Sequence, residues 1–193
     1  MPRLAATDAL IVVDVQNDFL PGGRLGVNDG DAVVPVLNRY IARFREAGLP
    51  VVATRDWHPP GHCSFTAQGG IWPEHCVADT DGAAFAAGLE LPDDAMVVSK
   101  ADTVEADAYS GFQGTELAAE LNRRGVTRVF VGGLATDYCV LNTVRDALAA
   151  DFEAILLADA VRAVDVEPGD GARAIEQMRA KGATTITVED IEP

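Results

Sequence analysis

The chain passes from a predicted buried strand into a predicted helix at Gly132-Gly133-Leu134-Ala135-Thr136-Asp137-Tyr138-Cys139-Val140. An apolar run from Arg128 to Val131 precedes this segment, and apolar residues recur after it at helical spacing as far as Leu148. We therefore expect Cys139 in the first turn of that helix, where unpaired backbone N–H groups and the helix dipole favour a thiolate over a thiol. A second interpretation stays open from this segment alone, because cysteine is also among the residue types most often buried as inert packing.

Other apolar runs alternate along the chain with segments of helical spacing. The runs are continuous, which is typical of parallel strands covered by helices on both faces. We predict an α/β protein with three layers, α/β/α, around a mainly parallel, six-stranded, Rossmann-like sheet, in a single domain over residues 1–193. The expected strands are 9–13, 50–54, 96–99, 128–131, 154–158 and 185–188, and the expected helices are 31–47, a short one between Thr115 and Gly125, 140–148 and 168–180.

The composition limits the partners and the location of the protein. The formal net charge of −15 argues against nucleic acid and against an anionic membrane surface as partners. No run approaches the ~18 uninterrupted apolar residues of a membrane span, and Met1 to Leu4 show no signal-peptide pattern. The odd number of cysteines, three, fits a reducing compartment. We therefore expect a cytoplasmic protein, and self-association into a homo-oligomer stays open.

Four chemically capable side chains, Asp14, Asp56, Lys100 and Cys139, lie at or just after the ends of predicted strands. The carboxyl ends of parallel strands share one edge of a sheet, and ligands bind there in such folds. A carboxylate close to a thiol accepts its proton, and an ammonium close to both stabilises the resulting thiolate. Asp14, Lys100 and Cys139 therefore form a candidate nucleophilic centre. Taken singly, Asp14 is also explained as a cap on backbone N–H groups, and Lys100 as a solvated lysine.

A second candidate site lies in and beside the segment 57–91, which has no clear periodicity and is long for a loop inside a compact domain. Asp56 and His58 are two residues apart in an extended segment and point the same way, and His75 completes a set of two histidines and one carboxylate. Such a set leaves positions open for water or substrate and suits Zn, Fe or Mn. The alternative is a group of solvent-exposed loop histidines. We expect His62 either to contact the ligands of this site from behind or to lie at its rim.

Two aromatic residues, Phe19 and Trp72, neighbour these candidate residues and are suited to line a pocket for a flat ring. Core packing is the alternative for both. Neither a G-x-G-x-x-G nor a Walker pattern is present, so no nucleotide-phosphate site is indicated.

Together these motifs resemble the nicotinamidase/pyrazinamidase group of the isochorismatase-like cysteine hydrolases, in order from about Ala9 to the last strand. The Asp56, His58 and His75 set is the more specific part, since it resembles the metal site of that group. The resembling segments are Asp14-Val15-Gln16-Asn17-Asp18-Phe19, Asp56-Trp57-His58-Pro59, Trp72-Pro73-Glu74-His75-Cys76, Lys100, Tyr109-Ser110-Gly111-Phe112 and Gly133-Leu134-Ala135-Thr136-Asp137-Tyr138-Cys139-Val140.

The resemblance implies the isochorismatase-like hydrolase fold and a role for each matching residue. Asp14 would be the proton acceptor, Lys100 its electrostatic partner and Cys139 the nucleophile. It implies one divalent metal ion, Zn ahead of Fe or Mn, held by Asp56, His58 and His75. It also implies an oxyanion hole from the backbone N–H groups of Ala135 and Cys139, a cis peptide at Leu134-Ala135, and ring contacts from Phe19, Trp72 and Tyr109. His62 and Ser64 are available as further ligands.

The implied function is hydrolysis of nicotinamide, and of pyrazinamide, to the acid and ammonia through a Cys139 thioester, with the metal anchoring the ring nitrogen. The expected partner is thus a small pyridine carboxamide, and the enzyme would belong to NAD salvage. A related cysteine amidohydrolase acting on a carbamoyl or ureido amide is the alternative enzyme. A catalytically silent pyridine-binding protein and a zinc-structured scaffold are further alternatives.

Overall fold

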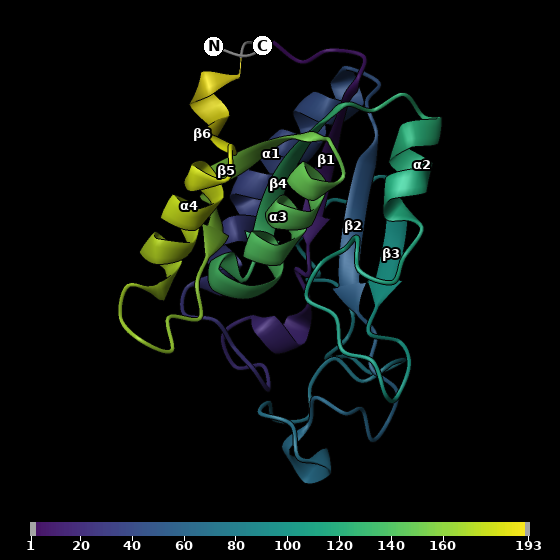
Figure 1. Ribbon diagram of the computed structural model, residues 1–193, viewed down its shortest axis with the longest axis vertical. Coiled ribbons are helices and arrows are strands. Elements are labelled where there is room, and N and C mark those ends of the chain that lie inside the picture. Colours follow the sequence, from purple (N-terminus) through teal and green to yellow (C-terminus); the bar gives the residue numbers. More distant parts are fainter. Residues whose placement is uncertain (1–2, 192–193) are drawn as a thin grey trace.

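The computed structural model describes residues 3–191 and contains a sheet of six parallel strands in the order β3-β2-β1-β4-β5-β6 (Figure 1). The strands are β1 (Asp8–Val13), β2 (Val51–Asp56), β3 (Met96–Lys100), β4 (Arg128–Leu134), β5 (Glu153–Arg162) and β6 (Thr184–Ile186). The predicted parallel sheet is confirmed. The predicted single domain also includes residues 1, 2, 192 and 193, which lie outside the described residues. The segment from Met1 to Leu4, in which no signal-peptide pattern was found, lies partly outside them too.

Helices cover both faces of this sheet, which confirms the three layers (Figure 1). Helix α1 (Val33–Glu46) packs on one face, and α2 (Leu117–Arg123), α3 (Leu141–Ala149) and α4 (Asp170–Ala180) pack on the other. Successive residues of β1 point to opposite faces, so Leu10 and Val12 contact the α1 side whereas Ile11 and Val13 contact the other side. Burial on both faces explains why the strands read as continuous apolar runs. Within residues 3–191, none of the helices has the length and apolar character needed to cross a membrane.

Each predicted strand differs from the observed one by one or more residues at its ends, and β5 and β6 differ for reasons that the structure shows. The run predicted as 154–158 continues to Arg162, because the end of β5 pairs with the end of β4 after a register shift. The run predicted as 185–188 ends at Ile186, because Thr187 caps a short 3-10 turn, Val188–Asp190. The other 3-10 turns are Asn17–Phe19, Gly30–Ala32 and Thr66–Gln68.

The strand order reverses between β1 and β4, which are neighbours in the sheet. From β1 the chain proceeds to β2 and β3 on one side, whereas β4 is followed by β5 and β6 on the other. Connections that leave two adjacent parallel strands in opposite directions open a crevice beyond their carboxyl ends. Asp14 follows β1 and Ala135 follows β4, so the quoted segment borders this crevice.

Candidate active site

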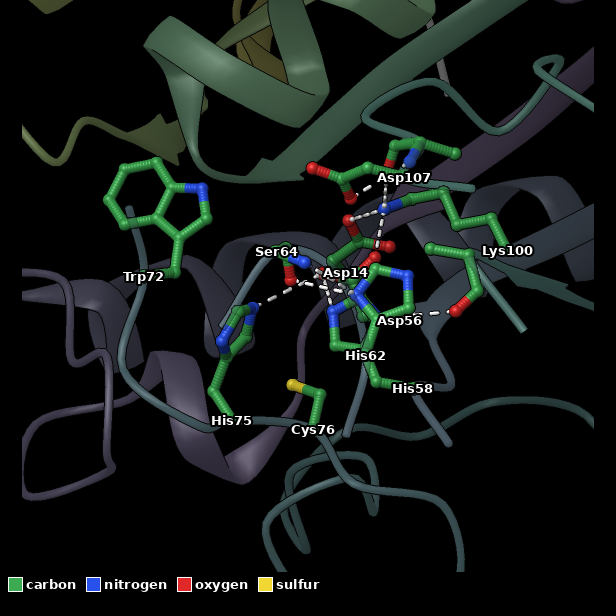
Figure 2. A network of polar contacts seen from close by, with 12 residues as sticks. Asp14, Asp56, His58, His62, Ser64, Trp72, His75, Cys76, Lys100 and Asp107 are labelled. Carbon is green, nitrogen blue, oxygen red and sulfur yellow. Dashed lines mark hydrogen bonds and ion pairs between the residues drawn. The ribbon is translucent and has the colours of Figure 1, made fainter. Parts of the chain in front are cut away.

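Asp14, Lys100 and Cys139 meet at the carboxyl edge of the sheet, and all three side chains are buried. The Nζ of Lys100 lies 2.9 Å from Oδ2 of Asp14 and 3.6 Å from Sγ of Cys139, and it also pairs with Oδ1 of Asp56. The hydroxyl of Thr54 donates to Oδ1 of Asp14 at 2.7 Å. A carboxylate oxygen of Asp14 lies within 4.8 Å of the Cys139 sulfur. The structure thus assembles a thiol, a carboxylate and an ammonium in mutual reach (Figure 2 shows the two acids and the lysine).

Burial and the neighbouring charges determine the protonation tendencies of this cluster. Burial lowers the pKa of Lys100, but Asp14 and Asp56 outweigh it and hold that pKa well above its usual value. Burial raises the pKa of Asp14, and Lys100 opposes this rise. Burial raises the pKa of the Cys139 thiol well above its usual value despite Lys100. The expected preference for a thiolate at the helix terminus is therefore outweighed by desolvation, and the thiol needs a proton acceptor such as Asp14.

The segment around Cys139 departs from a plain α-helical start. Residues Thr136–Val140 form one π-helical turn, and α3 begins only at Leu141. The peptide bond between Leu134 and Ala135 is cis, as the resemblance implies. The Ala135 N–H makes no hydrogen bond to any described residue, and Cys139 lies in the π-helical turn that follows. The oxyanion hole stays a prediction on these two N–H groups.

Asp56, His58 and His75 form a second buried group next to the first. The Nε2 atoms of His58 and His75 lie 3.6 Å and 3.9 Å from Oδ2 of Asp56. Each histidine turns Nδ1 to a backbone carbonyl, that of Ala101 at 3.1 Å or that of Pro73 at 2.7 Å, which directs Nε2 towards Asp56 (Figure 2).

This group has the properties of a divalent metal site. One possible ligand atom from each of its three residues lies within 4.8 Å of the others. The Nε2 of His58 is buried and has no hydrogen-bond partner among residues 3–191, a deficit that a metal ion removes. Burial lowers the pKa of His75, which favours the neutral imidazole that binds metals. Burial raises the pKa of Asp56, but Lys100 and His58 outweigh it and hold the carboxyl below its usual pKa.

Of the two positions expected for His62, the structure has the one behind the ligands and not the rim. Its side chain is fully buried and stacks on His58 with ring centroids 4.2 Å apart. Its Nδ1 lies 2.8 Å from the Ser64 hydroxyl, and its Nε2 lies 3.1 Å from the carbonyl of Ala106. Both ring nitrogens are thus engaged, which leaves His62 to support the site from behind. Burial also raises the pKa of Cys76, so that thiol is inert.

Phe19, Trp72 and Tyr109 all line one pocket, together with Cys139 and with the metal-site group. The indole N–H of Trp72 donates to the Tyr109 hydroxyl at 2.9 Å. The space between these residues is about 460 Å³ when the open solvent at its mouth is counted. The two candidate sites are therefore walls of one cavity.

Sequence reasoning missed several residues that shape this pocket. Tyr138 packs edge-on against Trp72 with ring centroids 5.1 Å apart, and its place beside Cys139 was the available signal. Gln16 holds both backbone groups of Asp56, since its Nε2 donates to the carbonyl and its Oε1 accepts from the N–H, each at 2.8 Å. Asp107 also lines the pocket, and no periodicity or motif pointed to it.

The chain belongs to the isochorismatase family, since the Isochorismatase domain matches residues 8–190. A nicotinamidase from Escherichia coli (strain K12) is 38% identical over 205 residues, covering 95% of this chain and 96% of that protein. The solved pyrazinamidase of Pyrococcus horikoshii in complex with zinc is 50% identical, with a TM-score of 0.90 over 94% of this chain and 99% of that chain. PnC1 from L. infantum in complex with nicotinate is 37% identical, with a TM-score of 0.91 over 99% of this chain and 98% of that chain. The resemblance predicted from the motifs is confirmed.

Proposed function

We propose that this protein is a cysteine amidohydrolase that converts nicotinamide to nicotinate and ammonia, and acts on the analogous pyrazinamide. The observation that carries the proposal is one pocket with aromatic walls that is lined both by Cys139 and by Asp56, His58 and His75. Behind Cys139, Lys100 pairs with Asp14 and lies within reach of the sulfur. The similar proteins add support, since one was solved with nicotinate and one with zinc. The cytoplasmic location, the absence of nucleic-acid and membrane partners, and self-association stay predictions.

In the first half of the reaction, Sγ of Cys139 attacks the carboxamide carbon while Asp14 takes the thiol proton. The negative charge that develops on the carbonyl oxygen is stabilised by the N–H groups of Ala135 and Cys139, and such donors are worth roughly 3 kcal/mol each. Lys100 holds Asp14 in place at 2.9 Å and stabilises developing negative charge on the sulfur, 3.6 Å away. The C–N bond then breaks, and Asp14 returns its proton to the leaving nitrogen, which departs as ammonia.

In the second half, water attacks the thioester carbon and Asp14 accepts a proton from that water. The C–S bond breaks, the acid is released, and the proton returns from Asp14 to the sulfur. One water is consumed for each amide hydrolysed, and the enzyme ends as it began.

Asp56, His58 and His75 would hold a divalent metal ion in this protein, and we propose zinc ahead of iron or manganese. When bound, the ion supplies a Lewis-acidic anchor for the nitrogen of the pyridine ring. The remaining orientation of the substrate comes from the chain itself, through the aromatic walls of Phe19, Trp72 and Tyr109.

Removal of the metal is expected to stop the reaction without unfolding the protein. The test measures ammonia release from nicotinamide before chelation, after chelation, and after zinc is returned. We expect loss to background and recovery, because the ring anchor is lost while the sheet and its core stay intact. His75→Asn is expected to behave like the chelated protein and to bind zinc at least about tenfold more weakly.

The controls for this experiment separate the alternatives. Circular dichroism of the chelated protein distinguishes an inactive folded enzyme from a zinc-structured scaffold, which would unfold. Full activity after verified removal of the metal would contradict the ring-anchor role and favour a carbamoyl or ureido amide as the substrate. Tight binding of nicotinamide without ammonia release would point instead to a pyridine-binding protein.

A further inference from the structure

We propose that the carboxylate of Asp107 is a specificity-determining group that favours the neutral amide over the acid product and thereby promotes product release. This inference rests on the proposed function, in which an uncharged carboxamide enters the pocket and an anion must leave it. Asp107 takes no part in the bond-making steps described above.

The position of Asp107 is next to the reacting end of the pocket. It lines the same cavity as Cys139, and the carbonyl oxygen of the following residue, Ala108, accepts a hydrogen bond from Nζ of Lys100 at 3.3 Å. That same Nζ lies 3.6 Å from the Cys139 sulfur. The Asp107 side chain is therefore carried by the stretch of backbone that touches the catalytic lysine (Figure 2).

Asp107 is held in place but keeps one oxygen available. Its Oδ1 accepts the N–H of Ala108 at 2.9 Å, and its backbone carbonyl accepts the side-chain amide of Gln113 at 3.3 Å. Among residues 3–191 the second carboxylate oxygen, Oδ2, has no hydrogen-bond or ion-pair partner. A carboxylate product brings a like charge towards this oxygen, whereas the amide substrate is uncharged.

The charge of Asp107 is also unpaired within the pocket wall. The other acidic residue of the wall, Asp56, pairs with Lys100 and faces the two histidines, whereas Asp107 has no cationic partner among the described residues. Burial raises the pKa of the Tyr109 hydroxyl, and the negative charge of Asp107 raises it further, so the field of Asp107 reaches this ring contact.

The negative charge of Asp107 matters for release of the product, which is an anion. A new carboxylate formed at Cys139 lies near the Lys100 ammonium, and the proposed metal ion adds further positive charge, so both would retain an anionic product. The half-buried carboxylate of Asp107, in the wall of the same pocket, counteracts that attraction. It costs the neutral substrate little, because an uncharged amide feels no net repulsion.

The test compares the dissociation constants of nicotinamide and nicotinate by titration calorimetry. The protein is zinc-loaded and carries Cys139→Ala, so that neither ligand turns over. Asp107→Asn is the test variant, because asparagine keeps the shape and the acceptor for the Ala108 N–H but removes the charge. Glu105→Gln is the matched control, since Glu105 is exposed nearby and does not line the pocket.

We expect Asp107→Asn to tighten nicotinate binding by about tenfold, the effect of one like charge at the pocket wall, while nicotinamide binding changes little. Glu105→Gln should leave both constants unchanged. In the enzyme that retains Cys139, the Asp107→Asn variant should show correspondingly stronger inhibition by nicotinate.

Equal changes for the two ligands, no change, or the same effect in Glu105→Gln would overturn the role of Asp107. A loss of nicotinamide binding in a folded Asp107→Asn protein would also overturn it, because Asp107 would then be a general binding residue. If the parent with Cys139→Ala binds neither ligand, the proposed function itself fails and this inference falls with it.

Discussion

Replacing Cys139 with alanine is expected to reduce ammonia release from nicotinamide by at least about a thousandfold while leaving the ligand bound. The thioester route has no substitute nucleophile, because the buried thiol faces Asp14 and Lys100 and the variant removes only the sulfur. Alanine creates a small void next to the pocket but leaves the aromatic walls and the metal-site residues in place. A coupled ammonia assay measures turnover, and calorimetry with nicotinamide measures binding.

Cys63→Ser is the matched control for this variant. Cys63 is a free, half-buried thiol that does not line the pocket, so its removal should leave turnover near the parental rate. Rapid acid quenching of the parent enzyme followed by mass spectrometry should detect the acyl adduct on the peptide that contains Cys139. Turnover of the Cys139→Ala protein within about tenfold of the parent would exclude the covalent route.

The parallel sheet was predictable because both of its faces are buried. Strand β1, for example, has no exposed residue. Its residues from Ala9 to Val13 therefore form a continuous apolar run, which is followed directly by Asp14. The convergence of Asp14, Lys100 and Cys139 followed from the same logic, since parallel strands bring their carboxyl ends to one edge. The apolar runs and the parallel topology were therefore enough to predict where the site lies.

The sequence predicted that Asp56 shares one edge of the sheet with Asp14, Lys100 and Cys139. It did not predict the direct contact between Asp56 and Lys100, because that contact depends on strand register. Asp56 is the last residue of β2, and it pairs in the sheet with Lys100 at the end of β3. Lys100 consequently bridges Asp14 and Asp56, and the sets interpreted separately from sequence are one network. A sequence pattern predicts which face a residue occupies, but it does not determine which residue of the next strand lies beside it.

The burial of side chains in and beside the loops could not be predicted from the sequence either. His62 and Cys139 are both covered by chain from the segments after β2 and β3, whose paths have no periodicity. The helix terminus at Cys139 was predicted with its favourable effect on a thiolate, but the burial that outweighs this effect depends on the tertiary packing. Tyr138 and Asp107 were missed for the same reason.

Replacing Lys100 with methionine is expected to have the largest effect on stability, a loss of about 3–5 kcal/mol in the free energy of unfolding. Lys100 is 1% exposed and is the cation between two buried carboxylates. Methionine has a similar length and no charge, so Asp14 and Asp56 lose their shared partner without a large change in packing. Urea unfolding of the chelated proteins measures the loss, because a bound metal would compensate Asp56.

Arg24→Met is the matched control, since it breaks an ion pair with Glu74 in which both side chains are more than half exposed, at 63% and 53%. It should cost less than about 1 kcal/mol. An equal, small cost for both variants would contradict the structural role of Lys100.

The double variant Lys100→Met with Asp14→Asn separates the structural role of the lysine from its chemical role. Neutralising Asp14 removes one unpaired buried carboxylate, and Asp56 retains His58 at 3.6 Å, so part of the lost stability should return. Ammonia release should not return, because the proton acceptor and the stabilising ammonium are both gone. Recovery of stability without recovery of turnover would mean that Lys100 keeps two acids ionised inside the fold and, through them, keeps an acceptor ready for the Cys139 proton. If Lys100→Met alone does not fold, folding of the double variant serves as the same readout, and its failure to fold would contradict the charge-balance argument.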